Sequence, residues 1–404
     1  METLTPEGVS YRLYCVIHIL SRLPPFAKSC VSVIISHVTR LFRLTLAIPF
    51  LMSFSFFQST SAPQAQTRPP AEKSIVPGPK PPDAPLEWKQ LVGIYRFSSY
   101  DNPDQTMIVL ERAQHLFLQS QGSPAKSGEI RESQGVVSIN DGNGRWYDHT
   151  VWRDDNGVIH FSYLTEIYSR EDAGSDPTHF YHVTPTQPVE ELREKALKLS
   201  PPAERGPFRK PDLVELATLD PAIHLDIRYA SSNNFLSTPV YTQARAFMQR
   251  PAAEALLRVL HKLQPLGYGL LIHDAYRPWY VTKIFWDATP PAGKIFVADP
   301  QKGSKHNRSC AVDLTLYDLA TGQAVGMPGL YDEMSPRSFP NFPGGTSLQR
   351  WHRDLLRRAM ESEGFTVNKD EWWHFDYKDW KQYGILNVAF EKIADSLQPT
   401  AISR

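Results

Sequence analysis

Two short stretches near the C-terminus carry side chains that could act together on a metal ion. In the first, His306 and Asp313 are seven positions apart, and in the second Glu371 precedes His374 by three positions. Two imidazoles and a carboxylate are enough for a three-ligand zinc site with an open fourth position. The other carboxylate could then take a proton from water at that position. This set of residues predicts a zinc-dependent hydrolytic centre.

The spacing of His306 and Asp313 restricts the local structure around them. An odd separation would point the two side chains to opposite faces of one regular strand. We therefore expect His306 in a loop, residues 307–309 as a turn, and Asp313 at the head of a strand that continues to Leu316. A loop histidine and a strand aspartate held by hydrogen bonds would explain either motif alone equally well. The two motifs together favour a metal site.

Two further groups fit such a centre. Glu371 would share a cavity with His374 and act as the general base. Arg277 belongs to the stretch Asp274–Pro278, which follows an apolar run, and could stabilise the oxyanion of a tetrahedral intermediate. A salt bridge between Asp274 and Arg277 is the alternative interpretation of that stretch.

The elements that must position these residues mix helices and strands. Helical apolar spacing covers Pro251–Leu263 and residues 351–359, and strand-like runs cover Leu270–His273 and Ala311–Leu316. This pattern predicts an α+β domain over residues 206–404 in which strands carry the ligands. Before it, residues 187–205 should hold a connecting helix and a linker.

Residues 86–186 follow a different pattern. Short apolar or alternating runs, such as Met107–Leu110 and Gly135–Ile139, are separated by turn-prone clusters such as Asn140–Gly144. The spacing predicts a small antiparallel β-domain of unknown function, either a sandwich or a barrel. Its histidines could form a second metal site, but scattered strand histidines are more often structural: His149, His160, His179 and His182.

The N-terminal 62 residues have the order of a secretory leader. Arg40 and Arg43 precede an apolar run from Leu44 to Phe57, and small residues follow it. That run is short for a membrane span. We expect residues 1–62 to be a leader with a secretory signal, so that the mature protein is exported, periplasmic or secreted. An uncleaved leader that anchors the protein in a membrane is the alternative.

Composition sets further limits. The chain of 404 residues is long enough for two folded units. The high proline content of residues 63–85 predicts an extended linker there. Lys plus Arg and Asp plus Glu number 43 each, so no basic excess points to nucleic acid. No protein partner is implied. Three cysteines are too few for a disulfide framework, and we expect Cys310 to be a small buried residue.

Three motifs in this order resemble a known family. Asp274-Ala-Tyr-Arg-Pro278, the stretch Ser304–Leu316 and Glu371-Trp-Trp-His374-Phe375 resemble the D-alanyl-D-alanine dipeptidases of the vancomycin-resistance type, within the zinc D,D-peptidase group. The segment Leu225–Ala230 is similar to that family's opening strand. The resemblance covers about residues 211–397, and the three motifs together are highly specific.

The resemblance implies a hedgehog/D,D-peptidase-like fold with one zinc ion per chain. It implies that His306, Asp313 and His374 bind the metal, that Glu371 is the catalytic base, and that Arg277 steadies the transition state. It further implies substrate contacts from Ser304 and Asp274. One position departs from the family, which usually has glycine where this chain has Ser309. Since glycine would suit a positive φ there, serine would strain or reshape the turn, and we expect the site to accommodate it.

The expected reaction is hydrolysis of the cell-wall dipeptide D-alanyl-D-alanine into two D-alanines. A peptidoglycan D,D-carboxypeptidase or endopeptidase is the alternative among enzymes. A non-catalytic cell-wall-binding protein, with the β-domain as its working part, is the alternative of another class. The intact set of ligands and Glu371 favours an enzyme.

Overall fold

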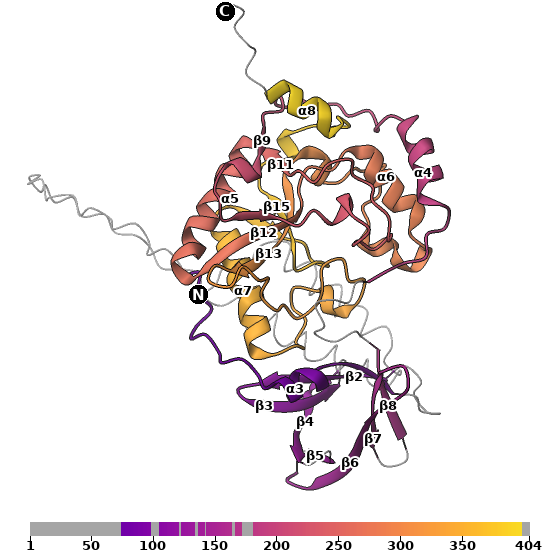
Figure 1. Cartoon of the computed structure of the whole chain (residues 1–404), viewed down its shortest axis with the longest axis vertical. Helices are drawn as coiled ribbons and strands as arrows, with labels where there is room; N and C mark the ends of the chain where they lie inside the picture. Colours follow the sequence, from indigo (N-terminus) through magenta and orange to yellow (C-terminus); the bar gives the residue numbers. More distant parts are fainter. Residues whose placement is uncertain are drawn as a thin grey trace, which may run out of the picture. The chain divides into compact units, whose positions relative to one another are not determined.

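The computed structural model describes residues 74–97, 105–120, 123–133, 136–141, 143–163, 166–171 and 181–397 (Figure 1). These residues belong to one compact unit, Ala71–Arg404. The expected leader, residues 63–73 of the expected linker and His179 lie outside the described residues. In the part of the chain that is described, no helix combines the length and apolar composition needed to cross a bilayer.

The predicted β-domain is a closed antiparallel barrel. Each strand pairs with the next one, and the eighth pairs with the first. Side chains alternate between the two faces, so that Leu116 and Leu118 of one strand and Val137 and Ile139 of another are buried inside. After helix α3 (Leu86–Leu91), the strands are β1 (Gly93–Phe97), β2 (Gln105–Arg112), β3 (His115–Ser120), β4 (Ser123–Ser133), β5 (Val136–Asn140), β6 (Trp146–Arg153), β7 (Ile159–Tyr163) and β8 (Glu166–Arg170).

The histidines of this region have structural surroundings. His160 lies 3.2 Å from a carboxylate oxygen of Asp154 and 2.9 Å from the hydroxyl of Ser169. His182 contacts the hydroxyl of Ser237. Within the described ranges, no three His, Cys, Asp or Glu side chains of the barrel come close enough to hold an ion.

The second part of the unit is built on a five-stranded mixed sheet with the order β10-β12-β13-β15-β14. The first pair, β10 and β12, is parallel, and the other neighbours are antiparallel. The strands are β10 (Ile223–Leu225), β12 (Tyr268–Asp274), β13 (Ala311–Asp318), β14 (Phe365–Val367) and β15 (His374–Tyr377). A separate antiparallel pair joins β9 (Leu213–Glu215) to β11 (Phe247–Gln249).

Helices complete the α+β arrangement that the sequence predicts. They are α4 (Val189–Leu197), α5 (Arg250–Leu263), α6 (Trp279–Ala288), α7 (Ser347–Ser362) and α8 (Phe390–Leu397). Single-turn 3-10 helices lie at η1 (Leu216–Thr218), η2 (Arg228–Ala230), η3 (Gln264–Leu266), η4 (Pro291–Phe296), η5 (His306–Arg308), η6 (Pro336–Ser338) and η7 (Trp380–Gln382). Both predicted helices of this domain are confirmed as α5 and α7, which pack on each other and on the sheet. The expected connecting helix is α4, and its buried side chains belong to the same hydrophobic core.

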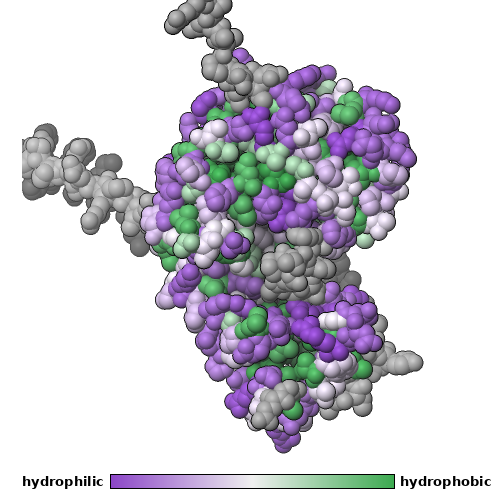
Figure 2. Space-filling model, in the orientation of Figure 1, coloured by the Kyte–Doolittle hydropathy of each residue, from purple (hydrophilic) through white to green (hydrophobic). Residues whose placement is uncertain are grey.

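Helix α6 was not predicted because its polar side is narrow, with only Lys283 and Asp287 paired four positions apart. Most of its side chains are buried, including Trp279, Ile284 and Phe285. Hydrophobic periodicity identifies a helix clearly only when a wide face is exposed to water. Figure 2 shows hydrophilic and hydrophobic residues interspersed over the visible surface.

One glycine holds the register at the centre of the sheet. Gly269 of β12 lies opposite Tyr317 of β13. A Cβ atom at position 269 would lie 2.2 Å from the Tyr317 ring, which stacks on His224 at a centroid distance of 4.2 Å. Only glycine leaves room for that ring. An irregularity in the pairing between Ile272 and Asp274 then shifts the register by one residue and places Asp274, at the end of β12, opposite Asp313.

Candidate metal centre and active site

Three adjacent strands and one turn bring the predicted ligands to one place. Asp313 on β13 has Asp274 of β12 as its partner on one side and His374 of β15 on the other. His306 comes from the 3-10 turn η5, which ends just before β13. The predicted division, with His306 in a turn and Asp313 on a strand, is confirmed.

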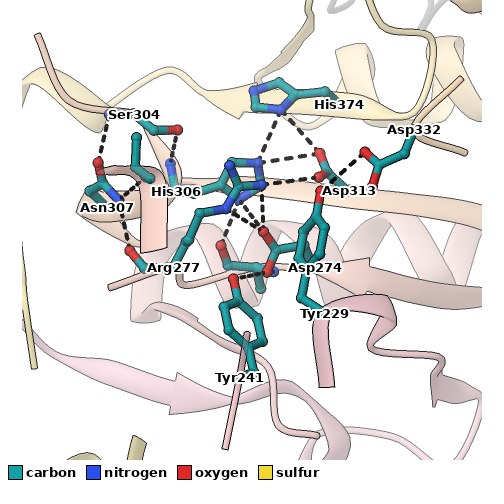
Figure 3. Close-up of polar contacts among 12 residues, drawn as sticks. Tyr229, Tyr241, Asp274, Arg277, Ser304, His306, Asn307, Asp313, Asp332 and His374 are labelled. Atoms are coloured by element: carbon teal, nitrogen blue, oxygen red, sulfur yellow. Dashed lines mark hydrogen bonds and ion pairs between the residues drawn. The ribbon is translucent and has the colours of Figure 1, made fainter. Parts of the chain in front are cut away.

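The inward atoms of these ligands form a nearly equilateral triangle (Figure 3). Nε2 of His306 lies 3.1 Å from Nδ1 of His374. Oδ1 of Asp313 lies 3.3 Å from the first nitrogen and 3.0 Å from the second. Ligands about 2.0–2.1 Å from a tetrahedral zinc ion are roughly 3.3 Å from one another. The triangle therefore has about the size of one face of a zinc tetrahedron.

Hydrogen bonds on the outer side of both imidazoles aim their lone pairs inward. Nδ1 of His306 lies 2.6 Å from the carbonyl oxygen of Ala275, which can only accept. Nε2 of His374 lies 2.9 Å from Oδ1 of Asp376. With the N–H groups used there, the inward nitrogens carry lone pairs toward Asp313 Oδ1, which is buried without a hydrogen-bond partner. Three such acceptors repel one another unless a cation lies between them, so the site fits a zinc ion.

Without a metal, protons would take the place of the cation. Burial lowers the pKa of His374, but the carboxylates of Asp376 and Asp313 outweigh it and raise that pKa well above its usual value. Burial raises the pKa of Asp313, but the charges of His306 and His374 outweigh it and hold that pKa well below its usual value. Metal binding must displace these protons, so metal affinity should fall as the pH falls.

Glu371 lies at the edge of the triangle, as the sequence predicts. Its Oε2 is 3.6 Å from Nδ1 of His374 and accepts a hydrogen bond of 2.8 Å from the side-chain amide of Asn368. Burial raises the pKa of Glu371, while His374 opposes the rise and Asp313 adds to it. A carboxylate with a raised pKa beside a metal site is suited to accept a proton.

Arg277 is held in a buried ion pair with Asp274, so the expected salt bridge is present, and the oxyanion role of Arg277 stays a prediction. Its Nε and Nη2 both donate to Oδ2 of Asp274, at 2.9 and 2.7 Å. Oδ1 of Asp274 accepts from the hydroxyl of Tyr241 at 2.7 Å. The guanidinium lines the cavity and its Nη2 lies 3.8 Å from Oδ2 of Asp313. Asp274 does not line the cavity; it lies behind Arg277 and fixes it.

A cavity of about 210 Å³ opens beside the triangle. Ser304, Arg277 and Glu371 all line it, as expected from the sequence. Its apolar walls come from separate segments of the chain, among them Phe235, Phe285, Val297, Met334 and Trp373.

Asp332 is a functional candidate that the sequence did not reveal. It lines the cavity, and its Oδ1 accepts a hydrogen bond of 3.0 Å from the hydroxyl of Tyr229, while its Oδ2 is buried without a partner. Burial and the nearby Asp313 carboxylate raise its pKa well above the usual value. Its φ of 56° is unusual for a residue other than glycine. None of these properties can be read from the surrounding residues Tyr331 and Glu333.

The turn between the first two ligands is strained, as the sequence predicts. Ser309 has φ 56° and ψ 32°, and its buried hydroxyl has no hydrogen-bond partner. Gln249 holds the turn, since its backbone N–H donates to the carbonyl of Ser309 and its side chain donates to the carbonyl of Arg308. Cys310 is buried as expected, and burial raises the pKa of its thiol to about 12, which leaves it unreactive.

Comparison with known proteins agrees with this geometry. Residues 209–393 match the family model described as D-Ala-D-Ala dipeptidase, peptidase M15. A D-alanyl-D-alanine dipeptidase of Escherichia coli (strain K12) is 34% identical over 179 residues, which are 44% of this chain and 91% of that protein. This chain belongs to the D-alanyl-D-alanine dipeptidase family. The resemblance noted in the sequence is confirmed.

Other members of the D-alanyl-D-alanine dipeptidase family are similar to this chain over comparable lengths. The D-alanyl-D-alanine dipeptidase of Enterococcus faecalis (strain ATCC 700802 / V583) is 34% identical over 185 residues, covering 40% of this chain and 90% of that protein. The one from Synechocystis is 37% identical over 171 residues, covering 32% of this chain and 68% of that protein. The family match begins after the barrel and α4, so it concerns the domain that holds the metal triangle.

The strain at Ser309 gives the first prediction. A left-handed backbone costs a residue with a Cβ about 1–2 kcal/mol, and glycine loses about 0.5–1 kcal/mol through its greater freedom when unfolded. Ser309→Gly should therefore raise the free energy of unfolding by up to about 1 kcal/mol, measured by urea denaturation at a fixed zinc concentration. Ser309→Ala is the matched control, because it removes the unpaired hydroxyl and keeps the strain. Equal effects of the two substitutions would contradict the strain explanation.

The second prediction concerns Asp376, which orients His374 from the outer side. Asp376→Ala should weaken zinc binding about 10- to 100-fold, as loss of such outer partners typically does. Asp376→Asn keeps an acceptor for the imidazole N–H and should weaken binding less. Competition with a chromogenic chelator measures both, and Asp379→Ala, three residues further on, is the control. Wild-type zinc affinity in Asp376→Ala would show that His374 needs no such partner.

Proposed function

We propose that this chain is a zinc-dependent dipeptidase that hydrolyses D-alanyl-D-alanine into two D-alanines. The observation that carries the proposal is the triangle of inward lone pairs with Glu371 at its edge. His306, Asp313 and His374 would hold one zinc ion per chain. The choice of dipeptide rests on the relatives, which are named D-alanyl-D-alanine dipeptidases.

The side chains divide the work of hydrolysis between them. Zinc, when bound, polarises a carbonyl group and acidifies water. Glu371 takes a proton from the attacking water and returns one to the leaving amine, so that it ends the cycle in its starting form. Arg277, held by Asp274, supplies positive charge where negative charge develops on the carbonyl oxygen.

Asp332 is suited to bind the substrate's free ammonium group. Its Oδ2 is buried without a hydrogen-bond partner, and Arg277, a cation that lines the same cavity, is already held by Asp274. Burial and Asp313 disfavour the charged form of Asp332, and an incoming ammonium group would relieve both effects. A peptide with a blocked N-terminus would leave this carboxylate unsatisfied.

The size of the cavity favours a short substrate. About 210 Å³ is below the roughly 300–1,000 Å³ of sites for drug-sized molecules. A dipeptide suits this space better than a peptidoglycan stem, which a D,D-carboxypeptidase or endopeptidase would take. We further infer that the sheet and its helices form a hedgehog/D,D-peptidase-like fold.

The proposed setting is outside the cytoplasm, in the periplasm or secreted. Support comes from the leader pattern in residues 1–62, which lie outside the described part of the chain. An exported enzyme would meet D-alanyl-D-alanine released from peptidoglycan during cell-wall turnover. Mass spectrometry of the zinc-loaded protein with D-Ala-D-Ala, L-Ala-L-Ala and a pentapeptide stem tests the proposal. Cleavage of the stem alone would favour the carboxypeptidase or endopeptidase.

Removing the general base should abolish turnover and leave the metal in place. General acid–base catalysis contributes about 10²–10⁴-fold. We therefore expect Glu371→Ala to lower kcat for D-Ala-D-Ala by at least that range, with normal zinc content by elemental analysis. Glu361→Ala changes an exposed glutamate on α7 and should behave as wild type. Near-normal turnover in Glu371→Ala would exclude the assigned role.

Neutralising Asp332 should affect free and N-blocked dipeptides differently. A hydrogen bond to a charged group contributes about 1.5–3 kcal/mol. Asp332→Asn should raise KM for D-Ala-D-Ala by about 10- to 100-fold, while hydrolysis of N-acetyl-D-Ala-D-Ala stays as slow as in the wild type. Steady-state kinetics with both substrates measure the contrast. An equal loss on both substrates would mean that Asp332 shapes the site without binding the amine.

A further inference from the structure

Strand β2 of the barrel contacts the N-terminal end of helix α7. Glu111 on this strand is fully buried, and its Oε2 accepts a hydrogen bond of 2.6 Å from the backbone N–H of Ser347, the first residue of α7. Its Oε1 accepts from the Ser347 hydroxyl at 3.2 Å and from the backbone N–H of Gln114 at 2.7 Å. A carboxylate at this end of a helix satisfies an N–H group that has no partner within the helix. The barrel therefore supplies part of the cap of α7.

The backbone of Glu111 binds the residues that lead into α7. Its N–H donates to the carbonyl of Gly345 at 3.2 Å, and Arg350 of α7 donates to its carbonyl at 2.7 Å. The same guanidinium donates to the carbonyl of Gly345 at 2.8 Å. Phe342 packs with Leu110 of β2 in a small apolar cluster. Polar and apolar contacts thus join the barrel to the stretch before α7, and Glu111 takes part in most of the polar ones.

The stretch that the barrel holds belongs to a wall of the cavity. Residues 319–346 connect β13 to α7, and among them Asp332 and Met334 line the cavity. Gly345 packs closely on Pro328 of the same segment, because a Cβ atom at position 345 would lie 3.2 Å from the Cα atom of Pro328. A shift of the backbone at the start of α7 would therefore also move the middle of the segment.

Arg337 joins that middle part to the cavity wall. Its buried side chain donates to the carbonyl of Pro328 at 3.1 Å and lies 3.3 Å from a carboxylate oxygen of Glu333, which lines the cavity. The next residue, Ser338, accepts a hydrogen bond of 2.8 Å at its carbonyl from the backbone N–H of Trp372. Trp372 directly follows the proposed general base in the sequence. A continuous set of contacts thus leads from the barrel to the active site.

We propose that Glu111 is a positioning residue of the active site, and that the β-barrel orders the segment of the cavity wall that carries Asp332. The proposal rests on the dipeptidase function proposed above and gives the barrel a part in substrate binding. With Glu111 in place, the start of α7 is fixed and Asp332 is held where it can meet the substrate's ammonium group. Without Glu111, that end of the segment is released, and only a fraction of the molecules has the arrangement that binds.

A cap that serves stability alone must be separated from positioning. If Glu111 only stabilises α7, its loss should lower the melting temperature and leave KM of the folded protein unchanged. If it positions Asp332, its loss should raise KM for D-Ala-D-Ala and should add nothing once Asp332 has been neutralised. Substitutions of residues that act through one another are not additive.

The test uses the full zinc-loaded protein. Glu111→Ala should raise KM for D-Ala-D-Ala about 2- to 30-fold, the factor that corresponds to loss of a helix cap, with a smaller change in kcat. In the Asp332→Asn background, the same substitution should leave KM within about 2-fold of Asp332→Asn alone. Glu111→Gln keeps an acceptor oxygen for the Ser347 N–H and should recover most of the wild-type KM. Glu132→Ala, which changes an exposed glutamate on β4, is the matched control.

Ser347→Pro removes the same hydrogen bond from the side of the helix. Proline is favoured as the first residue of a helix, and Thr346 before it already has the extended backbone that proline requires, with φ −89° and ψ 163°. This variant should therefore keep α7 and raise KM as Glu111→Ala does, and it decides the question should Glu111→Ala fail to fold. Ser347→Ala keeps the N–H group and should raise KM less.

Two outcomes would overturn the assignment. One is an unchanged KM in both Glu111→Ala and Ser347→Pro, and the other is a rise as large in the Asp332→Asn background as in the wild type. The proposed function is judged separately, by wild-type turnover of D-Ala-D-Ala in the same assay.

Should the wild type be inactive, amide hydrogen exchange of the zinc-loaded protein still decides the role of Glu111. The backbone N–H groups of residues 331–339 and of Trp372 should exchange faster in Glu111→Ala than in the wild type, while those of β13 keep their rates. Faster exchange confined to the first turn of α7 would mean that Glu111 caps the helix without ordering the cavity wall.

Discussion

A single buried oxygen, Oδ1 of Asp313, sets the requirements for the rest of the site. It faces the inward nitrogens of two imidazoles at about hydrogen-bond distance, and when both rings are neutral none of the three atoms has a proton to offer. In a protein interior such a group of acceptors is costly without a cation. The surrounding structure maintains this arrangement from the outside, through the carbonyl of Ala275 and the carboxylate of Asp376.

The same region contains the backbone strain one expects near a functional site. Ser309 and Asp332 both have φ near 56°, one in the turn between two ligands and the other on the cavity wall. Buried charges add to the cost, because Asp274 and Arg277 are withdrawn from water and only offset one another. A bound metal ion would stabilise the folded state by an amount that grows with the logarithm of its affinity. The folded state and the occupied site are therefore linked.

The charge distribution of the cavity connects the chemistry to the choice of substrate. The roles proposed for Glu371 and the metal ligands concern cleavage of the amide bond, and they carry no information about the ends of the peptide. Asp332 lines the same small cavity. The proposed binding of the substrate's ammonium group to Asp332 would favour a free N-terminus over an internal bond of a long chain, since an unmatched buried charge costs affinity.

The sequence alone determined the chemistry of the centre and much of its framework. Residue types and spacing singled out the candidate site residues His306, Asp313, His374 and Glu371. A metal site needs particular donor atoms, and the residue types that supply them can be read from the sequence. Periodicity identified the amphipathic helices α5 and α7, because their exposed and buried sides differ in composition. It also identified strands of the β-domain, but could not decide between a sandwich and a barrel, since closure depends on the pairing of β1 with β8.

Tertiary structure decided what depends on distance and not on residue type. Helix α6 escaped prediction because burial of most of its side chains leaves little periodicity. Asp332 became a candidate only when folding placed it on the wall of the cavity, and nothing local distinguishes it from other charged residues. Asp376 could have been noticed, since it shares a strand face with His374 two positions earlier. Its role still depended on the orientation of the His374 ring, whose Nε2 must point toward Asp376. The packing of β13 against β15 and the position of His306 set that orientation.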